Sequence, residues 1–134
     1  MKKIEHVAIA VKQLSVSIPV FEKLLNTSCY KTELIESEQV NTAFFAIGEN
    51  KIELLEASSE ASVINNFIKK RGEGLHHIAI EVDDIEAEMD RLMSEGFTLL
   101  NQKPKSGADN KMVCFLHPKD SNGVLIELVM GKKD

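Results

Sequence analysis

The sequence predicts an α+β fold built from two tandem β-α-β-β-β modules, and three observations support this prediction. Short β-branched runs alternate with segments of helical periodicity in the order β-α-β-β-β, helix, β-α-β-β-β. The stretch HVAIAV that begins at His6 returns as HIAIEV at His77, 71 positions later. KIELL around Glu53 returns as LIELV around Glu127, 74 positions later, so the two offsets differ only by the size of a loop insertion.

The first module covers about residues 4–56 and begins with a short buried strand at 4–11. A helix follows at 15–25, and its apolar residues have helical spacing: Val16, Val20, Phe21, Leu24 and Leu25. Because proline fits only in the first turn of a helix, Pro19 places the start near Ser15 or Ser17, and Asn26 is the expected stop. Three strands are expected next, at 30–36, 40–47 and 51–56.

A linking segment at about 60–72 carries a short helix that Gly72 ends, and the second module covers about 75–130. The second module begins with a strand at 75–82 and a helix at 84–95, for which Asp83 and Glu86 have the spacing of a capping box. Gly96 ends this helix, and residues 103–110 are a polar loop. The remaining strands are expected at 97–102, 112–117 and 123–130.

Length and composition exclude several classes of protein and of partner. The 134 residues suit a single domain over 1–134, and 43% apolar with 28% charged residues excludes a disordered chain. The net charge of −5 argues against nucleic acid as a partner, because phosphate binding needs a basic footprint. Neither a membrane-spanning run nor a signal-peptide pattern is found, so no membrane partner and a cytoplasmic location are expected. Cys29 and Cys114 are expected to be buried thiols.

Four polar residues interrupt apolar strands at positions that match between the two modules. His6 and His77 each share a strand face with alanines, which leave room beside the ring. Glu53 and Glu127 each lie between two large aliphatic residues, and an unpaired buried carboxylate is very costly. Taken singly, each His fits a hydrogen-bonded core position and each Glu fits a solvent-facing one. Their recurrence at matching positions favours a shared role.

The shared role we expect is metal binding. Two imidazoles and two carboxylates make a mixed N and O ligand set: His6, Glu53, His77 and Glu127. A structural zinc site would prefer thiolates, whereas this set suits a six-coordinate Co²⁺, Zn²⁺, Ni²⁺, Mn²⁺ or Fe²⁺ that also binds substrate oxygens. His76 competes with His77, but it lies on the opposite strand face, and the repeat selects His77.

Four stretches of the chain resemble a known family: IEHVAIAV at 4–11, NKIELLE at 50–56, KRGEGLHHIAIEVDDI at 70–85 and FLHPKDSNGVLIELV at 115–129. From about residue 4 to 130 the chain is similar to the methylmalonyl-CoA epimerases, which belong to the vicinal oxygen chelate superfamily. The resemblance implies a cupped mixed sheet around a metal site, with the helices on its outer face. It also implies a homodimer and a CoA thioester substrate.

The activity implied by the resemblance is metal-dependent epimerisation of (R)- and (S)-methylmalonyl-CoA at C2, through an enolate-like intermediate chelated by the cation. It implies one divalent ion per chain, with Co²⁺ favoured, bound by His6, Glu53, His77 and Glu127. Glu127 is the leading candidate base. The alternatives are a lactoylglutathione lyase (glyoxalase)-type metalloenzyme and a non-catalytic small-molecule-binding member of the superfamily.

The chain departs from this family in one strand. Some epimerases carry a second glutamate in the strand that matches residues 40–47, where this sequence has Thr42 and Ala43 near the expected place. The second base could therefore be Glu53, Glu81 on the His77 face, or a metal-bound water, and we favour Glu53.

Overall fold

The computed structural model describes residues 1–132, which divide into two compact units. Residues 6–76 form the N-terminal unit, and residues 1–5 with 77–132 form the C-terminal unit. Within these residues, none of the helices combines the length and the apolar character that a membrane span requires. The elements are β1 (Lys3–Ala10), α1 (Leu14–Leu25), β2 (Lys31–Ile35), β3 (Val40–Ile47), β4 (Asn50–Ala57), α2 (Val63–Arg71), β5 (Gly74–Glu81), α3 (Ile85–Ser94), β6 (Lys105–Ser106), β7 (Lys111–Leu116) and β8 (Ile126–Gly131), with 3₁₀ turns at Ala108–Asn110 and Pro118–Asp120.

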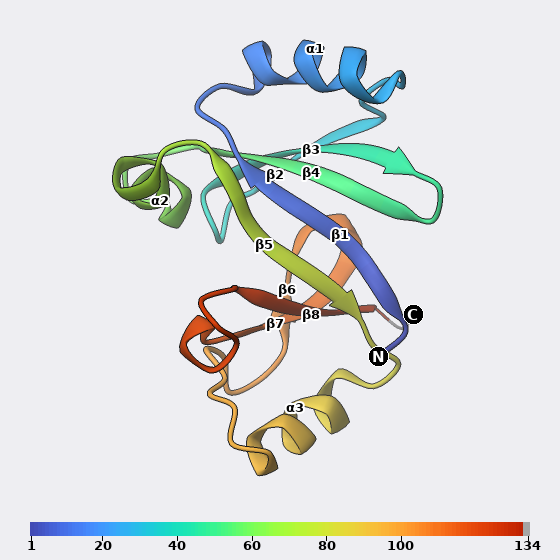
Figure 1. Ribbon diagram of the computed structural model, residues 1–134, viewed down its shortest axis with the longest axis vertical. Coiled ribbons are helices and arrows are strands. Elements are labelled where there is room, and N and C mark those ends of the chain that lie inside the picture. The colour runs from blue at the N-terminus through green and yellow to red at the C-terminus, as the bar shows by residue number, and fades with distance from the viewer. Residues whose placement is uncertain (133–134) are drawn as a thin grey trace. The chain divides into compact units, whose positions relative to one another are not determined.

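The N-terminal unit contains a mixed sheet in the order β2-β3-β4-β1 (Figure 1). Strand β1 runs parallel to β4, whereas β3 is antiparallel to both β4 and β2. The register places Ala8 opposite Glu53. His6 lies two residues before Ala8 and therefore on the same face of β1. The sheet therefore presents a histidine and a glutamate from neighbouring strands on one face.

The C-terminal unit repeats this arrangement in the order β5-β8-β7-β6. Here β5 runs parallel to β8, β7 is antiparallel to β8, and β6 is antiparallel to β7. Ala79 lies opposite Glu127, as Ala8 lies opposite Glu53 in the other unit. The α+β class and the two β-α-β-β-β modules are confirmed. The matching registers place the repeated residues of the sequence at equivalent positions in the two modules.

Two helices cover the faces that do not carry the histidines. In the N-terminal unit α1 lies over β3 and β4 (Figure 1). It packs Leu14, Ile18, Phe21 and Leu25 against apolar side chains of these strands. In the C-terminal unit α3 contributes Ile85, Met89 and Leu92 to a cluster with side chains of β7 and β8. Burial of these apolar faces, at about 25 cal/mol per Å², is the main force that holds each helix to its sheet.

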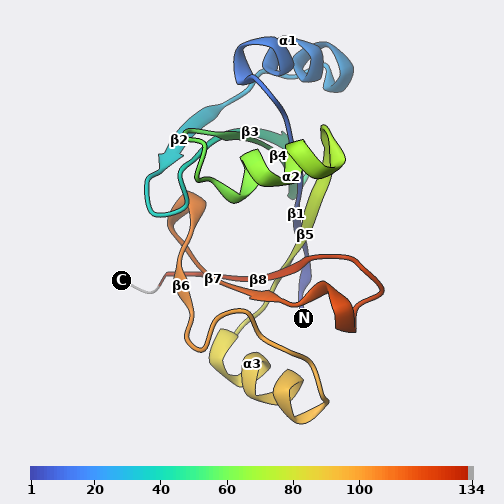
Figure 2. The same ribbon diagram turned by 90° about the vertical axis from the view of Figure 1, so that its left-hand side faces the viewer.

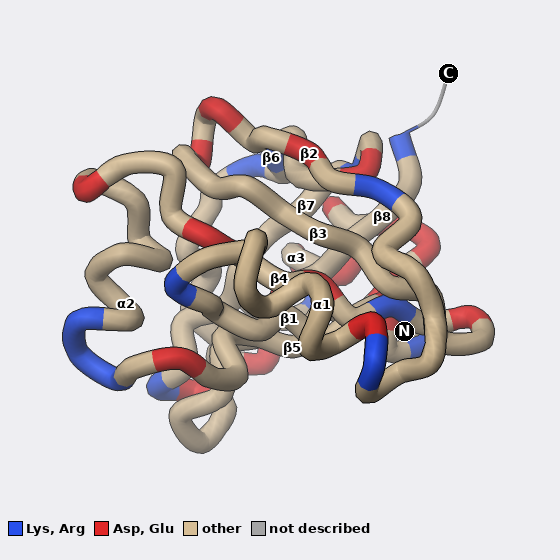
Figure 3. Tube along the Cα trace, turned by 90° about the horizontal axis from the view of Figure 1, so that it is seen from above, with Lys and Arg blue, Asp and Glu red and all other residues tan. Residues whose placement is uncertain are grey.

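The third helix, α2, packs at the opposite face of the N-terminal sheet (Figure 2). Ile64, Phe67 and Ile68 form one cluster with Ala8 and Ala10, so the alanines of β1 make room for this helix. Ser62 accepts a hydrogen bond from the backbone N–H of Ile64 at the start of α2, and Gly72 follows its end with a φ of 77°. Figure 3 shows the run of basic residues in the last turn, where they complement the helix dipole.

Helix α1 differs from its prediction in two respects. It begins at Leu14, so Pro19 lies inside the helix and not in the first turn. Three of the residues expected on its packed side are exposed instead: Val16 at 60%, Val20 at 55% and Leu24 at 70%. The helix carries two apolar stripes, and the one that contains Ile18 and Phe21 faces the sheet. The predicted stop at Asn26 is confirmed, with a φ of 52°.

The expected strand at 97–102 is largely absent, which corrects the prediction. Leu99 makes a single bridge to Leu116, and the short strand β6 lies at 105–106, within the expected loop. The side chain of Asn101 explains the difference. Its Oδ1 accepts a hydrogen bond from the backbone N–H of Phe115 at 2.9 Å, in place of a hydrogen bond between the two backbones. The N-cap of α3 is also Asp84, not Asp83, because Asp84 accepts from the N–H of Ala87.

Candidate metal centre

The first pair of candidate ligands lies within the N-terminal unit. Nδ1 of His6 on β1 is 2.9 Å from Oε2 of Glu53 on β4. Both residues are buried, with 5% and 4% exposure. The parallel register of β1 and β4 produces this contact. It sets Glu53 opposite Ala8, and Ala8 is the next residue after His6 on the same face of β1. The small side chain of Ala8 lets the imidazole and the carboxylate meet.

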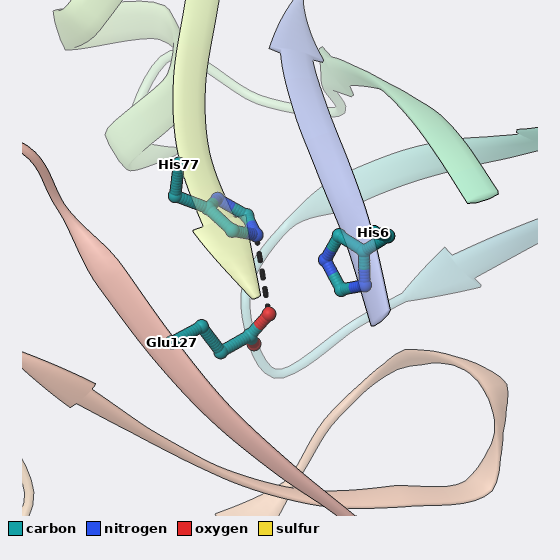
Figure 4. Close-up of side chains that lie close together, drawn as sticks. All are labelled: His6, His77 and Glu127. Atoms are coloured by element: carbon teal, nitrogen blue, oxygen red, sulfur yellow. Dashed lines mark ion pairs between the residues drawn. The ribbon is translucent and has the colours of Figure 1, made fainter. Parts of the chain in front are cut away.

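The second pair lies within the C-terminal unit, and Figure 4 shows it as sticks. Nε2 of His77 on β5 is 3.1 Å from Oε1 of Glu127 on β8. These residues are also buried, at 7% exposure each. Ala79 lies opposite Glu127, so the same strand geometry produces both pairs. The structure thus brings His6 to Glu53 in one unit and His77 to Glu127 in the other.

A phenylalanine accompanies each glutamate on the neighbouring strand. Phe44 lies opposite Glu53, and Phe115 lies opposite Glu127. The rings of His77 and Phe115 meet edge to face, with centroids 5.3 Å apart and an interplanar angle of 89°. Aromatic contacts of this geometry fix the orientation of an imidazole and keep water from one side of it. An aromatic ring therefore borders the His77–Glu127 pair on one side.

The chemistry of each pair fits a divalent ion. Imidazole nitrogen and carboxylate oxygen are the donors that borderline divalent metals accept in proteins. A carboxylate that is more than nine-tenths buried needs a cation or hydrogen-bond donors to stay ionised, and both Glu53 and Glu127 are buried to this degree. Each His–Glu pair offers two donors, which is fewer than the three or four protein ligands usual in a zinc-type site.

The remaining candidates from the sequence have other contacts. Oε2 of Glu81 lies 3.5 Å from Nζ of Lys2. The ring of His76 packs edge-on against Phe67 of α2, with centroids 4.9 Å apart. Thr42, which stands near the place of the second glutamate of some epimerases, is 1% exposed on β3 and lies opposite Leu55.

Sequence reasoning missed Phe44 and Phe115, although a signal was present. The 71-residue offset that relates His6 to His77 also relates Phe44 to Phe115. Apolar residues in strands are so common that a repeated phenylalanine attracts no notice by itself. Applying the 71-residue offset to every apolar residue of the strand at 40–47 would have paired Phe44 with Phe115.

Comparison with known proteins places this geometry in context. Residues 5–115 match the Glyoxalase/Bleomycin resistance protein/Dioxygenase superfamily. The ethylmalonyl-CoA/methylmalonyl-CoA epimerase of Cereibacter sphaeroides is 40% identical over 128 residues, which are 94% of this chain and 96% of that protein. Two solved structures are also similar. The methylmalonyl-CoA epimerase of Mycobacterium tuberculosis has 34% identity and a TM-score of 0.93, with 98% of this chain and 89% of that chain covered. A variant of the Streptomyces coelicolor enzyme in complex with 2-nitronate-propionyl-CoA has 31% identity and a TM-score of 0.95, with 99% of each chain covered.

Proposed function

Since the chain belongs to the Glyoxalase/Bleomycin resistance protein/Dioxygenase superfamily, we propose that it is a metal-dependent epimerase that interconverts (R)- and (S)-methylmalonyl-CoA at C2. The observation that carries this proposal is the buried His–Glu pair in each unit, at equivalent positions of the repeat. Relatives of 31–40% identity that cover nearly the whole chain are epimerases of this substrate, which supports the choice of reaction.

The proposed ligands are the four paired side chains of His6, Glu53, His77 and Glu127, which together would hold one divalent ion, with Co²⁺ favoured. Such an ion would supply electrostatic stabilisation of negative charge on the thioester carbonyl oxygen, which makes the proton at C2 more acidic. C2 lies between that carbonyl and a carboxylate.

Glu127 is proposed to take the proton from one face of C2. Its carboxylate is buried beside His77, on the face of β8 that carries the proposed ligand. His77, 3.1 Å away, orients the carboxylate, and Phe115 on the next strand packs against that imidazole. These contacts keep the base in one position, which is what efficient proton transfer needs.

Epimerisation also needs a group that delivers a proton to the opposite face of C2, and we assign this role to Glu53. It is the buried carboxylate at the equivalent position of the other unit, paired with His6 at 2.9 Å. Glu81 fits this role less well, because its carboxylate is close to the ammonium group of Lys2. Thr42 offers a hydroxyl whose pKa is far too high for a general base near neutral pH.

The experiment that tests the function is proton exchange. Purified protein with added Co²⁺ is incubated with (S)-methylmalonyl-CoA in D₂O, and C2 is followed by NMR. We expect deuterium at C2 and formation of the (R) isomer, both suppressed by a chelator. The glutathione hemithioacetal of methylglyoxal serves as the comparison substrate. Conversion of that compound without exchange at C2 of methylmalonyl-CoA would show that the protein is a glyoxalase-type enzyme and not an epimerase.

A further inference from the structure

A lysine stands on the same sheet face as the His77–Glu127 pair. We propose that Lys105 binds the free carboxylate of the substrate and so selects acyl-CoA thioesters that carry a second acid group. This inference rests on the proposed function and adds a residue to its site. The residue lies on β6, in the C-terminal unit, as do His77 and Glu127.

The register of three strands fixes where the side chain of Lys105 points. Lys105 lies opposite Val113 on β7, and Val113 lies opposite Val129 on β8. Directly opposite residues of antiparallel strands project to the same side of a sheet, so Lys105 shares a face with Val129 and with Glu127. Nζ of Lys105 lies 5.8 Å from the centroid of the Phe115 ring.

Phe115 connects Lys105 to the proposed ligands. Its ring meets His77 edge to face at 5.3 Å, its backbone pairs with that of Glu127, and its π-system attracts the ammonium of Lys105. Lys105 is half-buried, and its contact with the ring of Phe115 holds the ammonium on the sheet face that carries Glu127. Ala79, Val113 and Val129 form a small apolar cluster on the same face, whose short side chains suit a small branched acyl group.

Charge balance indicates what this ammonium would bind. In the proposed site the carboxylates of Glu53 and Glu127 balance the two charges of a divalent ion. A methylmalonyl group then brings one further negative charge into poorly solvated surroundings, which is costly without a counter-charge. An ammonium on the same face supplies it and would hydrogen-bond the carboxylate oxygen.

The internal repeat shows that the fold does not require a cation at this position. The equivalent residue of the N-terminal unit is Glu33 on β2, which lies opposite Thr42 as Lys105 lies opposite Val113. The phenylalanine of that unit, Phe44, also has a lysine over its ring, Lys31 at 5.2 Å, but this lysine is 3.5 Å from Glu33. Two structurally equivalent edge positions therefore carry opposite charges, which argues for a ligand-specific role of Lys105.

The test compares two ligands that differ in one carboxylate. Malonyl-CoA and acetyl-CoA are titrated by calorimetry into the metal-loaded wild type, Lys105→Gln, Lys105→Arg and, as a matched control, Lys103→Gln. Lys103 lies two residues earlier and is exposed. We expect Lys105→Gln to weaken malonyl-CoA binding ~10-fold, the scale of one charged hydrogen bond, and to leave acetyl-CoA binding unchanged. The Arg variant should retain most of the affinity, and the control should match wild type for both ligands.

Each result decides between the possibilities. Equal weakening of both ligands would show that Lys105 binds the CoA phosphates, and no weakening would show that it binds neither group; both overturn the inference. In kinetics, the KM for methylmalonyl-CoA should rise in Lys105→Gln more than kcat falls. A wild type that exchanges C2 of methylmalonyl-CoA but shows no carboxylate-dependent effect of Lys105 overturns this inference alone. A wild type that neither exchanges C2 nor prefers malonyl-CoA overturns the proposed function with it.

Discussion

In the proposed mechanism, Glu127 serves both as a metal ligand and as a base. It is buried, lies beside His77, and has an apolar neighbour, Val129, on the same face. A buried carboxylate stays ionised only with a cation or hydrogen-bond donors nearby, and only the ionised form can accept a proton. The two roles respond differently to an amide substitution, which separates them by experiment.

We predict that Glu127→Gln remains slow even at saturating metal, with a loss of ~10²-fold or more in epimerisation, the usual scale for removing a general base. If Glu127 were only a ligand, excess metal would restore most of the rate. Washout of the C2 proton into D₂O should fall further for one stereoisomer than for the other, because a base on one face serves one hand of the substrate.

The matched control for this measurement is Glu81→Gln, which alters a carboxylate on the same strand face that lies beside Lys2. It should keep near-normal exchange. Near-normal exchange from both stereoisomers by metal-loaded Glu127→Gln would show that Glu127 is not the base, and a large loss in Glu81→Gln would move the role to that residue.

Asp120 gives a pH-dependent prediction outside the site. The backbone N–H of Thr98 donates to its carboxylate at 2.8 Å, and this hydrogen bond holds the pKa of Asp120 below its usual value. Because the folded pKa lies below the unfolded one, the bond stabilises the fold above the unfolded pKa, and its contribution is lost as the pH falls through the folded pKa. Urea unfolding should therefore show Asp120→Asn less stable than wild type at about pH 6, with the difference shrinking below about pH 4. A difference that stays constant over this range would contradict the assignment.

At the scale of elements, the sequence predicted where the helices stop, but it was less accurate for their starts and for the packed face of α1. Asn26, Gly72 and Gly96 follow the helix ends because C-capping depends on local backbone conformation, which Asn and Gly residues indicate. The direction in which α1 packs depends on the sheet beneath it, and two apolar stripes fit the same spacing. The sequence of residues 97–102 predicts a strand, but the pairing stops after a single bridge at Leu99, because the side chain of Asn101 takes the N–H of Phe115.

Pro19 lies in the interior of α1, and its ring removes the N–H that would bond to the carbonyl of Ser15. Because Pro19 is exposed, its removal costs little packing. We predict that Pro19→Ala raises the free energy of unfolding by about 1–3 kcal/mol, since proline is far less favourable than alanine in a helix interior. Thermal unfolding followed by circular dichroism measures this, with Val20→Ala as a nearly neutral exposed control. Destabilisation by Pro19→Ala would contradict this prediction and show that proline stabilises the fold at this position.

At the scale of the whole molecule, the repeat made the fold and the four paired residues predictable. Matching registers, with Ala8 opposite Glu53 and Ala79 opposite Glu127, give repeated polar positions a common geometry. The contact of Lys105 with Phe115 was not predictable, because it depends on the position of a two-residue edge strand that falls where the sequence predicts a loop. The homodimer stays a prediction from the resemblance.

The proposed centre takes two ligands from each unit, so its metal stoichiometry reports on the molecule as a whole. We predict about one divalent ion per chain by elemental analysis, and its loss in both His6→Ala and His77→Ala, because two donors from one unit cannot hold the ion alone. Metal should also raise the Tm of wild type, since a ligand that binds only the folded state stabilises it, and it should raise the Tm of neither variant.

His76→Ala provides the matched control, because His76 is the chain neighbour of His77 but packs against Phe67. It should retain the ion and the metal-dependent rise in Tm. If the two His–Glu pairs were independent sites, wild type would bind two ions, and each histidine variant would lose only one of them. A metal content that falls to zero when either unit loses its histidine is the result that only a shared site produces, because neither substitution touches the pair in the other unit.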